Sequence, residues 1–412
     1  MTTAATKHIT APENCTGCAL CANVCSKGAV SMVWSEAGFL VPAVDTDACV
    51  ECGLCVKSCP AQEDNLKKLH YADDNQSVVS YGAWNRDSSV HRHSSSGGVF
   101  TALAENVIAA GGCVFGVVWK DKLTPVFDKA ETPEQLARMR GSKYTHANAA
   151  GIYRAVRHEL STGRRVLFSG TSCQVNALRQ FLRKEYDNLL TVDIVCHGMP
   201  SHLILEKYVE HWEKECGSPV RHISFREKSE GWLNYHVARN HEDGSTRSTE
   251  HHKDMYMRLF LSDLALNKAC YNCPYAHLPR SGDITLGDFW GVQQVHPDWP
   301  IREGVSAVLA TSAKGQEALL NCSAALNLMP ESFETISAKQ RAVYIRPKKE
   351  VPQHRARALS LLKQLPLTSA VHRILECDYC GRFCFVWRSF PWFFYKLAQK
   401  TKNCITRCLR KK

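Results

Sequence analysis

Two runs of four cysteines near the N-terminus constrain this chain more than any other feature. The stretches "CTGCALCANVC" and "CVECGLCVKSCP" both space their cysteines as C-x2-C-x2-C-x3-C. Gaps of two residues let successive side chains converge on one point, so each run predicts a metal site built from thiolates. The eight cysteines are Cys15, Cys18, Cys21, Cys25, Cys49, Cys52, Cys55 and Cys59.

The doubled spacing resembles that of bacterial two-cluster ferredoxins, in which three cysteines of a run bind one 4Fe–4S cluster and the fourth reaches the other. We therefore assign Cys15, Cys18, Cys21 and Cys59 to one cluster, and Cys49, Cys52, Cys55 and Cys25 to the second. Zinc is the alternative, but zinc sites usually consist of two ligand pairs rather than two runs of four thiols. Ser26 follows the first run where proline is usual, and this change removes no ligand.

The segment between the runs, "AVSMVWSEAGFLVPAV", predicts two strands joined by a turn at 36–38. We expect a ferredoxin-like module over residues 1–72, followed by a polar linker at 70–77. The N-terminus lacks the apolar core of a secretory signal. With 20 cysteines clustered in a chain of 412 residues, we expect metal binding in a reducing cytoplasm rather than disulfides.

From residue 78 the pattern alternates between strands and helices, which predicts an α/β domain. The serine- and glycine-rich stretch "SSSGG" at 94–98 runs into a helical segment that is closed by Gly111 and Gly112. A helix that begins this way presents free backbone N–H groups, and glycine allows a phosphate to approach them. An ordinary helix cap without a ligand is the alternative, and from these residues alone it is the commoner outcome.

Four more cysteines stand at places that favour a ligand site. Cys173 follows one buried strand, Cys196 ends the next, and Cys270 and Cys273 form a C-x2-C pair. Ligands of α/β sheets bind beyond the carboxyl ends of the strands. These four thiols could hold a third 4Fe–4S cluster; equally, Cys173 and Cys196 could be buried apolar residues and the pair a redox dithiol or half a zinc site.

Seven stretches together resemble the coenzyme F-420 hydrogenase/dehydrogenase beta-subunit family. They occur in family order over roughly residues 78–310, behind the ferredoxin repeat that commonly precedes them. In chain order they are "SSSGGVFTALA" (94–104), "GSKYTHAN" (141–148), "GTSCQVNALR" (170–179), "IVCHGMPS" (194–201), "ISFREKSEGW" (223–232), "YMRLFLSDLALNKACYNCPYA" (256–276) and "RSGDITLGDFWG" (280–291).

The resemblance implies an FAD-binding iron–sulfur flavoprotein. The fold class that follows is α+β/α/β multidomain: the ferredoxin-like module, then an FAD-binding α/β domain with parts at 78–160 and 161–345. By motif, Cys173, Cys196, Cys270 and Cys273 hold a third cluster, which favours the cluster over the alternatives above. Ser96, Gly97 and Gly98 are implied to lie along the FAD phosphates, and Gly141, Ser142, Lys143 and Tyr144 along the flavin ring. The family usually has proline where this chain has Ser172.

Four side chains near these motifs have two interpretations each. Lys143 either stabilises negative charge on the flavin or substrate, or is an exposed loop lysine. Asp283 and Asp288 are either catalytic or turn and capping residues. His197, next to Cys196, either donates a hydrogen bond near the cluster or is structural.

Most of the net charge of +11 lies at the C-terminus, where residues 377–412 contain nine Lys or Arg and one acid. This distribution argues against a nucleic-acid partner, because a binding face should extend over a folded domain. The aromatic, basic tail at 376–412 either contacts the inner membrane surface or a partner protein, or packs on the protein itself. No apolar stretch is long enough to cross a membrane. Cys377, Cys380 and Cys384 resemble an incomplete metal site, which we do not assign.

We expect a cytoplasmic iron–sulfur flavoprotein oxidoreductase that passes electrons between 4Fe–4S clusters and FAD. Hydride transfer would connect the flavin to a deazaflavin-like or other organic substrate. Its partners would be a redox protein or a small-molecule electron carrier, and a homo-oligomer is compatible with the sequence. One alternative is a non-catalytic electron-transfer subunit that serves a partner enzyme, and another is a zinc-stabilised scaffold. No G-x-G-x-x-G opens a helix after a strand, so no nicotinamide site is predicted.

Overall fold

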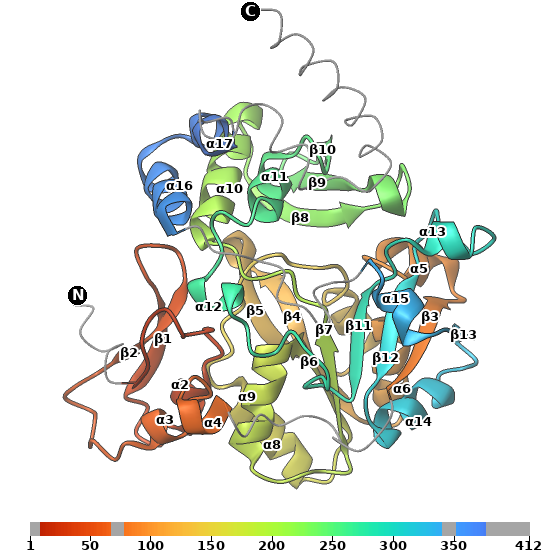
Figure 1. The fold of residues 1–412 in the computed structure, drawn as a ribbon, viewed down its shortest axis with the longest axis horizontal. Helices are drawn as coiled ribbons and strands as arrows, with labels where there is room; N and C mark the ends of the chain where they lie inside the picture. The colour runs from red at the N-terminus through yellow and green to blue at the C-terminus, as the bar shows by residue number, and fades with distance from the viewer. Residues whose placement is uncertain (1–8, 67–77, 340–351, 376–412) are drawn as a thin grey trace, which may run out of the picture.

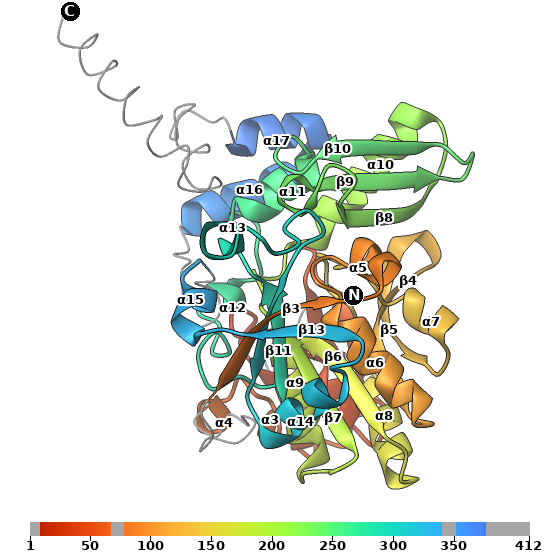
Figure 2. The ribbon, with the colours of Figure 1, turned by 90° about the vertical axis from the view of Figure 1, so that its right-hand side faces the viewer.

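The computed structural model describes residues 9–66, 78–339 and 352–375. These residues form a small N-terminal module, a large mixed sheet with helices on both faces, and a smaller sheet with its own helices (Figures 1 and 2). The linker predicted at 70–77, the tail at 376–412 and the cysteines 377, 380 and 384 lie outside the described residues. Within the described residues, no helix combines the length and apolarity that crossing a membrane requires.

The N-terminal module contains one hairpin and three short helices, and the hairpin confirms the strand–turn–strand prediction for residues 30–44. Strands β1 and β2 pair in antiparallel register, from Val30 opposite Val44 to Trp34 opposite Leu40. The two cysteine runs repeat one local structure, because a left-handed residue, Ala19 (φ 62°) or Gly53 (φ 67°), precedes the helix in each. The elements are α2 (Leu20–Val24), β1 (Val30–Trp34), β2 (Leu40–Val44), α3 (Leu54–Lys57) and α4 (Glu63–Leu66).

The large sheet has eight strands in the order β13-β3-β12-β11-β7-β6-β4-β5. Its centre is parallel, since β4 pairs with β6, β6 with β7 and β7 with β11 in parallel register. The outer strands on both sides run antiparallel. Strands from both predicted parts of the α/β domain share this sheet: β3 (Val79–Asn85), β4 (Cys113–Lys120), β5 (Thr124–Ala130), β6 (Val166–Thr171), β7 (Leu189–Ile194), β11 (Ile284–Asp288), β12 (Ser306–Ala310) and β13 (Leu326–Pro330).

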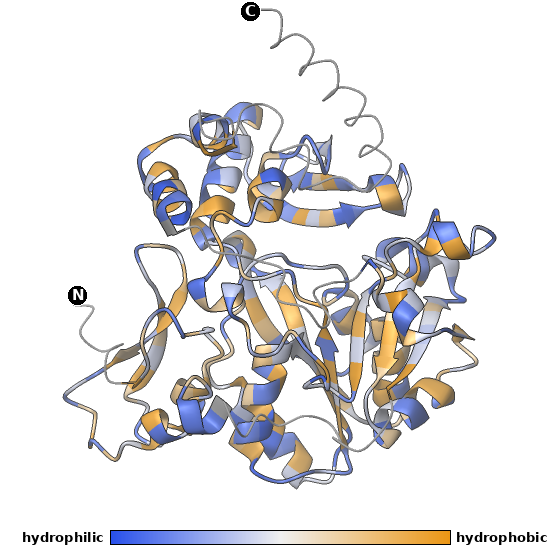
Figure 3. Cartoon of the chain, in the orientation of Figure 1, coloured by the Kyte–Doolittle hydropathy of each residue, from blue (hydrophilic) through white to orange (hydrophobic). Residues whose placement is uncertain are grey.

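Apolar residues make up most of the central strands (Figure 3), as expected for strands covered on both faces. A few buried polar residues, among them Asp193 and Thr285, lie among them. On β4, Phe115 belongs to the core that contains α8 (Ile152–Ser161), α9 (Ser172–Leu182) and the N-terminal module. Its neighbour Val114 belongs to the opposite core, with α6 (Val99–Ala109) and α14 (Ala313–Asn321). Successive side chains of β4 therefore point to opposite faces of the sheet, and each face is covered by its own helices. The N-terminal module contributes to one of these two cores.

Asn23 fastens the N-terminal module to α8. Its Nδ2 donates to the carbonyl oxygens of Ala19 (2.8 Å) and Ala149 (2.9 Å), and its Oδ1 accepts from the backbone N–H of Tyr153 at 3.1 Å. The side chain is 2% exposed, so these bonds are shielded from water. The N-terminal module therefore packs directly against the large domain and is not joined to it by a linker alone.

The smaller sheet has the order β10-β9-β8, and its β9–β10 hairpin turns at Asp243-Gly244. Helices α10, α11, α16 and α17 pack with this sheet around an apolar core of its own, separate from the two cores of the large sheet. Gly217 ends α10 in the left-handed conformation. The elements are α10 (His202–Cys216), β8 (Val220–Glu227), β9 (His236–His241), β10 (Thr246–Glu250), α11 (Met255–Leu261), α16 (Pro352–Gln364) and α17 (Leu367–Leu375).

The remaining elements are short and connect these layers. They are α5 (Ser88–His93), η2 (Asp121–Leu123), α7 (Pro133–Ala137), η3 (Trp232–Asn234), α12 (Lys268–Tyr271), α13 (Val292–Val295) and α15 (Phe333–Ser337).

Candidate functional site

A cavity of about 300 Å³ opens at the carboxyl ends of the parallel strands. It is bordered by the last residues of β6 and β7 and by Leu286, Gly287 and Asp288 at the end of β11. The first turn of α6 and the loop at 141–145 form other walls. Its size and its place in the sheet are those of a small-molecule or cofactor site.

The serine–glycine loop and the start of α6 supply one wall of this cavity. Gly98, which precedes α6, has φ 80° and no side chain caps the helix, so the first N–H groups keep their capacity to bind an anion. Ser96 and Gly98 line the cavity. Gly97 lies behind the wall instead, because its N–H donates to Ser306 Oγ at 2.9 Å. A Cβ at Gly97 would stand 2.1 Å from the carbonyl oxygen of Ala83.

Gly141, Ser142, Lys143 and Tyr144 all line the same cavity. The N–H of Ser142 donates to Ser95 Oγ at 2.8 Å, which joins this loop to the serine–glycine loop. Lys143 Nζ donates to the carbonyl oxygens of residues 138–141 at 2.9–3.2 Å. Burial lowers the pKa of Lys143 to about 7. Neither interpretation of Lys143 describes this arrangement, in which its ammonium group binds the chain's own carbonyls.

Asp288, which lines the cavity, forms an ion pair with the buried Arg226. Arg226 NH1 lies 2.8 Å from Asp288 Oδ2. The same NH1 donates to the phenol oxygen of Tyr144 at 3.3 Å. Trp232 Nε1 also donates to Asp288, at 3.0 Å. Asp288 is therefore the partner of Arg226 rather than a turn or capping residue.

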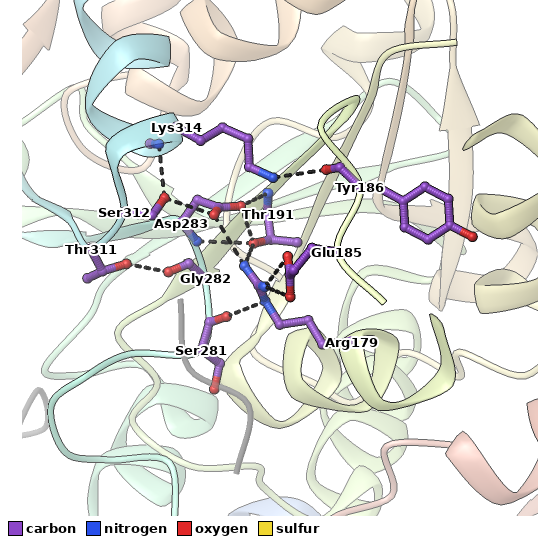
Figure 4. A network of polar contacts seen from close by, with 11 residues as sticks. Arg179, Glu185, Tyr186, Thr191, Ser281, Gly282, Asp283, Thr311, Ser312 and Lys314 are labelled. Atoms are coloured by element: carbon purple, nitrogen blue, oxygen red, sulfur yellow. Dashed lines mark hydrogen bonds and ion pairs between the residues drawn. The ribbon is translucent and has the colours of Figure 1, made fainter. Parts of the chain in front are cut away.

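Asp283 is likewise the centre of a buried polar network (Figure 4). It pairs with Arg179 at 3.2 Å and accepts from Ser312 Oγ at 2.9 Å and from the N–H of Thr191 at 2.8 Å. Burial raises the pKa of its carboxyl, but the charge of Arg179 and these hydrogen bonds outweigh burial and hold that pKa below its usual range. Its role is structural, since it joins α9, β7 and β11.

The four cysteines predicted to hold the third cluster all border a second, smaller cavity, although they come from distant parts of the chain. Cys173 lies in the first turn of α9, Cys196 follows β7, Cys270 is on α12 and Cys273 follows it. Burial raises the pKa of Cys173 well above its ordinary value, and the neighbouring thiols of Cys273 and Cys196 raise it further. Without a metal these side chains stay neutral thiols, because buried thiolates would repel one another, and a bound metal cluster would stabilise them as thiolates.

Two hydrogen bonds reach these sulfur atoms. The N–H of Met199 donates to Cys270 Sγ at 3.3 Å, and Thr171 Oγ1 lies 3.1 Å from Cys173 Sγ. Hydrogen bonds to ligand sulfurs tune the potential of iron–sulfur clusters. Within the residues that the structure describes, no three His, Cys, Asp or Glu side chains converge on a single metal ion. The donor set fits a sulfur-ligated cluster.

The loop 196–199 separates the two cavities and borders both. His197 in this loop has its Nε2 2.8 Å from Asp263 Oδ1, and its ring lies against Phe260 at 4.7 Å between centroids. A group bound among the four cysteines would therefore be next to one bound in the larger cavity.

The structure brings the first N-terminal ligand set together. Cys15, Cys18, Cys21 and Cys59 border one small cavity. Burial raises the pKa of Cys15 to about 11 and that of Cys59 to about 12, and Cys18 contributes to both. In the second set, burial raises the pKa of Cys55, with Cys25 and Cys49 adding to it. Cys25 therefore lies with the second run and Cys59 with the first, in the crossed arrangement of the assignment, and Cys52 is exposed.

Two tyrosines connect the first set to the third. Tyr153 is fully buried and its OH donates to the carbonyl oxygen of Cys18 at 2.7 Å. Burial raises the pKa of Tyr153 and that of Tyr275. Cys18 and Cys173 raise both pKa values further. Cys18 also raises the pKa of Cys173 directly. The first set, the third set and the larger cavity are thus neighbours in that order.

Sequence reasoning missed several polar residues at these sites. Lys228, 7% exposed, donates from Nζ to the carbonyl oxygens of Ser96 at 3.0 Å and His91 at 2.8 Å. Arg280, 1% exposed, borders the cavity of the third set. Both lie in stretches that resemble the family, Lys228 in 223–232 and Arg280 at the start of 280–291, but the sequence does not show which groups their side chains contact. Only the tertiary structure reveals these contacts.

Comparison with known proteins gives three family matches. Residues 80–153 match the model of the coenzyme F420 hydrogenase/dehydrogenase beta subunit N-terminus, and residues 163–335 that of its C terminus. Residues 14–62 match a 4Fe-4S dicluster domain. Among solved structures, a chain of the F420-reducing [NiFe] hydrogenase complex from Methanosarcina barkeri is similar, with 18% identity and a TM-score of 0.47. That match covers 70% of this chain and 94% of the other.

Proposed function

Since this chain belongs to the coenzyme F420 hydrogenase/dehydrogenase beta-subunit family and carries an N-terminal 4Fe-4S dicluster domain, we propose that it is an iron–sulfur flavoprotein oxidoreductase. In this proposal the chain passes electrons between its clusters and FAD, and exchanges hydride with a deazaflavin coenzyme. The family description, which names coenzyme F420, supports the choice of substrate class.

One observation carries the proposal: the candidate sites for the cofactors are contiguous. Thr16, which lies between Cys15 and Cys18 of the first set, lines the cavity of the third set. Cys18 also raises the pKa of Cys173. The loop 196–199 is a wall of both the third-set cavity and the larger cavity. Contiguous sites are what stepwise electron transfer through one chain requires, whereas a scaffold with zinc sites has no need for them.

The larger cavity has the chemistry that FAD binding needs. The uncapped start of α6 offers backbone N–H donors for phosphate groups. Tyr144 and Phe260 provide apolar surface for a ring system. When bound, FAD supplies hydride chemistry and the 4Fe–4S clusters supply one-electron transfer.

The chain's own residues would keep water away from these groups. Tyr153, Tyr275 and Arg280 are buried between or beside the cysteine sets. The carboxylate of Asp288 is paired with the guanidinium group of Arg226. We therefore do not assign it as a general base. We assign no residue to proton transfer, since hydride exchange with a flavin needs none.

The composition of the protein tests the third cluster. After anaerobic purification, the wild type should contain about twelve iron atoms and one FAD per chain, and a Cys270→Ser/Cys273→Ser variant about eight iron atoms. Cys216→Ser is the matched control, because this cysteine ends α10 outside every set. About eight iron atoms in all three proteins, or zinc in place of iron, would overturn the third cluster.

Turnover tests the substrate. Chemically reduced coenzyme F420 should bleach the bound flavin within one turnover and should then reduce an artificial electron acceptor continuously. Bleaching by dithionite but not by the deazaflavin would exclude this substrate class. Reduction of the clusters with no flavin present would favour the electron-transfer subunit instead.

A further inference from the structure

One buried guanidinium group contacts the backbone segments that carry three of the four third-set cysteines. Arg280 NH1 donates to the carbonyl oxygen of Tyr275 at 2.8 Å. Its NH2 donates to the carbonyl oxygen of Ile194 at 3.2 Å and to Ser172 Oγ at 2.6 Å. Each partner is one or two residues from a ligand: Ser172 before Cys173, Ile194 before Cys196 and Tyr275 after Cys273.

Arg280 has one acidic counter-ion in this set of contacts. Its NH2 lies 3.2 Å from Asp193 Oδ2, and that carboxylate is completely buried. Ser172 links the two, because its hydroxyl accepts from Arg280 and donates to Asp193 Oδ2 at 2.6 Å. Thr285 donates to the other carboxylate oxygen. Ser172 is also the position at which the chain departs from the family's usual proline, which has no hydroxyl group to make this link.

The surroundings fix Arg280 in place. Arg179 of α9 donates from Nε to the carbonyl oxygen of Ser281 at 3.0 Å, directly after Arg280 (Figure 4). The pairing of β11 with β7 sets Thr285 opposite Asp193. The guanidinium group therefore cannot swing into solvent, and its charge borders the third-set cavity permanently.

We propose that Arg280, with Asp193 as its counter-ion and Ser172 between them, sets the reduction potential of the third cluster. This inference rests on the proposed function, since it needs a cluster at this site. Reduction adds one negative charge to a cluster, so a fixed cation nearby stabilises the reduced state and raises the potential. The carboxylate acts in the opposite direction and limits the rise. Arg280 is a positioning and tuning residue here, and the four cysteines remain the ligands.

The test is a redox titration of the full chain, with dithionite as reductant and electron paramagnetic resonance as the readout. The third-cluster signal is the one that Cys270→Ser/Cys273→Ser removes. Arg280→Met should lower its midpoint potential, and Asp193→Asn should raise it. We expect at least a tenfold change in the reduction equilibrium in each case, which is about 59 mV for one electron. Arg280→Lys, which keeps the charge, should stay closer to the wild type.

The two variants of opposite sign distinguish tuning from folding. A merely structural role predicts loss of iron in both variants with no shift in the potential of the clusters that remain. If Arg280→Met does not fold, Asp193→Asn alone must raise the potential for the proposal to stand. An unchanged potential with a full third signal overturns this inference and leaves the proposed function intact. Absence of a third signal from the wild type overturns both.

Discussion

Lys228 Nζ donates a 3.0 Å hydrogen bond to the carbonyl oxygen of Ser96, which ties the end of β8 to the loop before α6. The same ammonium group donates to the carbonyl oxygens of His91 and Glu303. One buried cation therefore joins the smaller sheet to a wall of the candidate flavin cavity. The shape of that wall depends on a residue more than 120 positions away in the sequence.

Lys228→Met should weaken FAD binding at least tenfold, because three buried carbonyls lose their donor and the loop loses its anchor. A tenfold loss is about 1.4 kcal/mol of binding free energy. Iron content should stay at the wild-type level, and fluorescence titration of the released flavin measures the change. Lys253→Met is the control, since that lysine is largely exposed and pairs with Glu250. Equal FAD affinity in both variants would show that Lys228 does not hold the loop.

Thr16, between Cys15 and Cys18, lines the third-set cavity, so we expect a magnetic interaction between clusters bound at the first and third sets. Fully reduced wild-type protein should give a broadened resonance spectrum. Removal of the third set by Cys270→Ser/Cys273→Ser should sharpen the N-terminal signals, whereas Cys216→Ser should leave them broad. N-terminal signals of the same width in all three proteins would contradict the contiguity of the sites.

The Arg239–Asp254 pair in the smaller sheet should contribute strongly to stability. Its atoms are 3.1 Å apart and both side chains are 1% exposed. Arg239→Met leaves a buried carboxylate without its cation, so we expect a loss of about 3–5 kcal/mol in the free energy of unfolding. The exposed pair Arg221–Glu242 is the matched control, and its loss through Arg221→Met should cost less than about 1 kcal/mol. Denaturant unfolding at pH 7 measures both, and similar losses would refute the comparison.

His251 should make the folded protein sensitive to acid. Burial lowers the pKa of His251 to about 4, and its ring is stacked on Tyr235 at 4.2 Å. The unfolded chain binds a proton near pH 6.5, so the stability from this group is complete above that pH and is lost as the pH falls toward 4. His251→Phe keeps the stacking and removes the titration. At pH 5.5 the wild type should have lost about 1 kcal/mol more than the variant, relative to pH 8. Parallel pH profiles would contradict the assignment.

The cysteine runs show how much local spacing encodes. Both runs predicted a 4Fe-4S dicluster domain, which the match over residues 14–62 confirms. The strands and turn at 30–44 are also confirmed, because ligand gaps and turn residues act over a few positions. The same holds for the helix that follows the serine–glycine loop. The family is confirmed by the matches over residues 80–153 and 163–335. The FAD residues and the third cluster stay predictions.

Local spacing carried less information where the partners are far apart. Asp283 and Asp288 had two interpretations each, and the structure shows both as partners of buried arginines. Lys143 had two interpretations and fits neither, because its partners are the carbonyls of the turn that precedes it. Gly97 lies behind the cavity wall rather than in it, since β3 and β12 crowd its backbone.

The sequence by itself determined the 4Fe-4S dicluster domain, the alternation of strands and helices, and the family, because each depends on residues that are close in the chain or on motifs in order. Only the tertiary structure decided that Cys173, Cys196, Cys270 and Cys273 share one cavity, and that Arg280 and Lys228 lie beside the sites. The physical reason is the strand order: β11 inserts next to β7, some 90 residues away. Apolar periodicity marks a strand as buried but does not specify its neighbour.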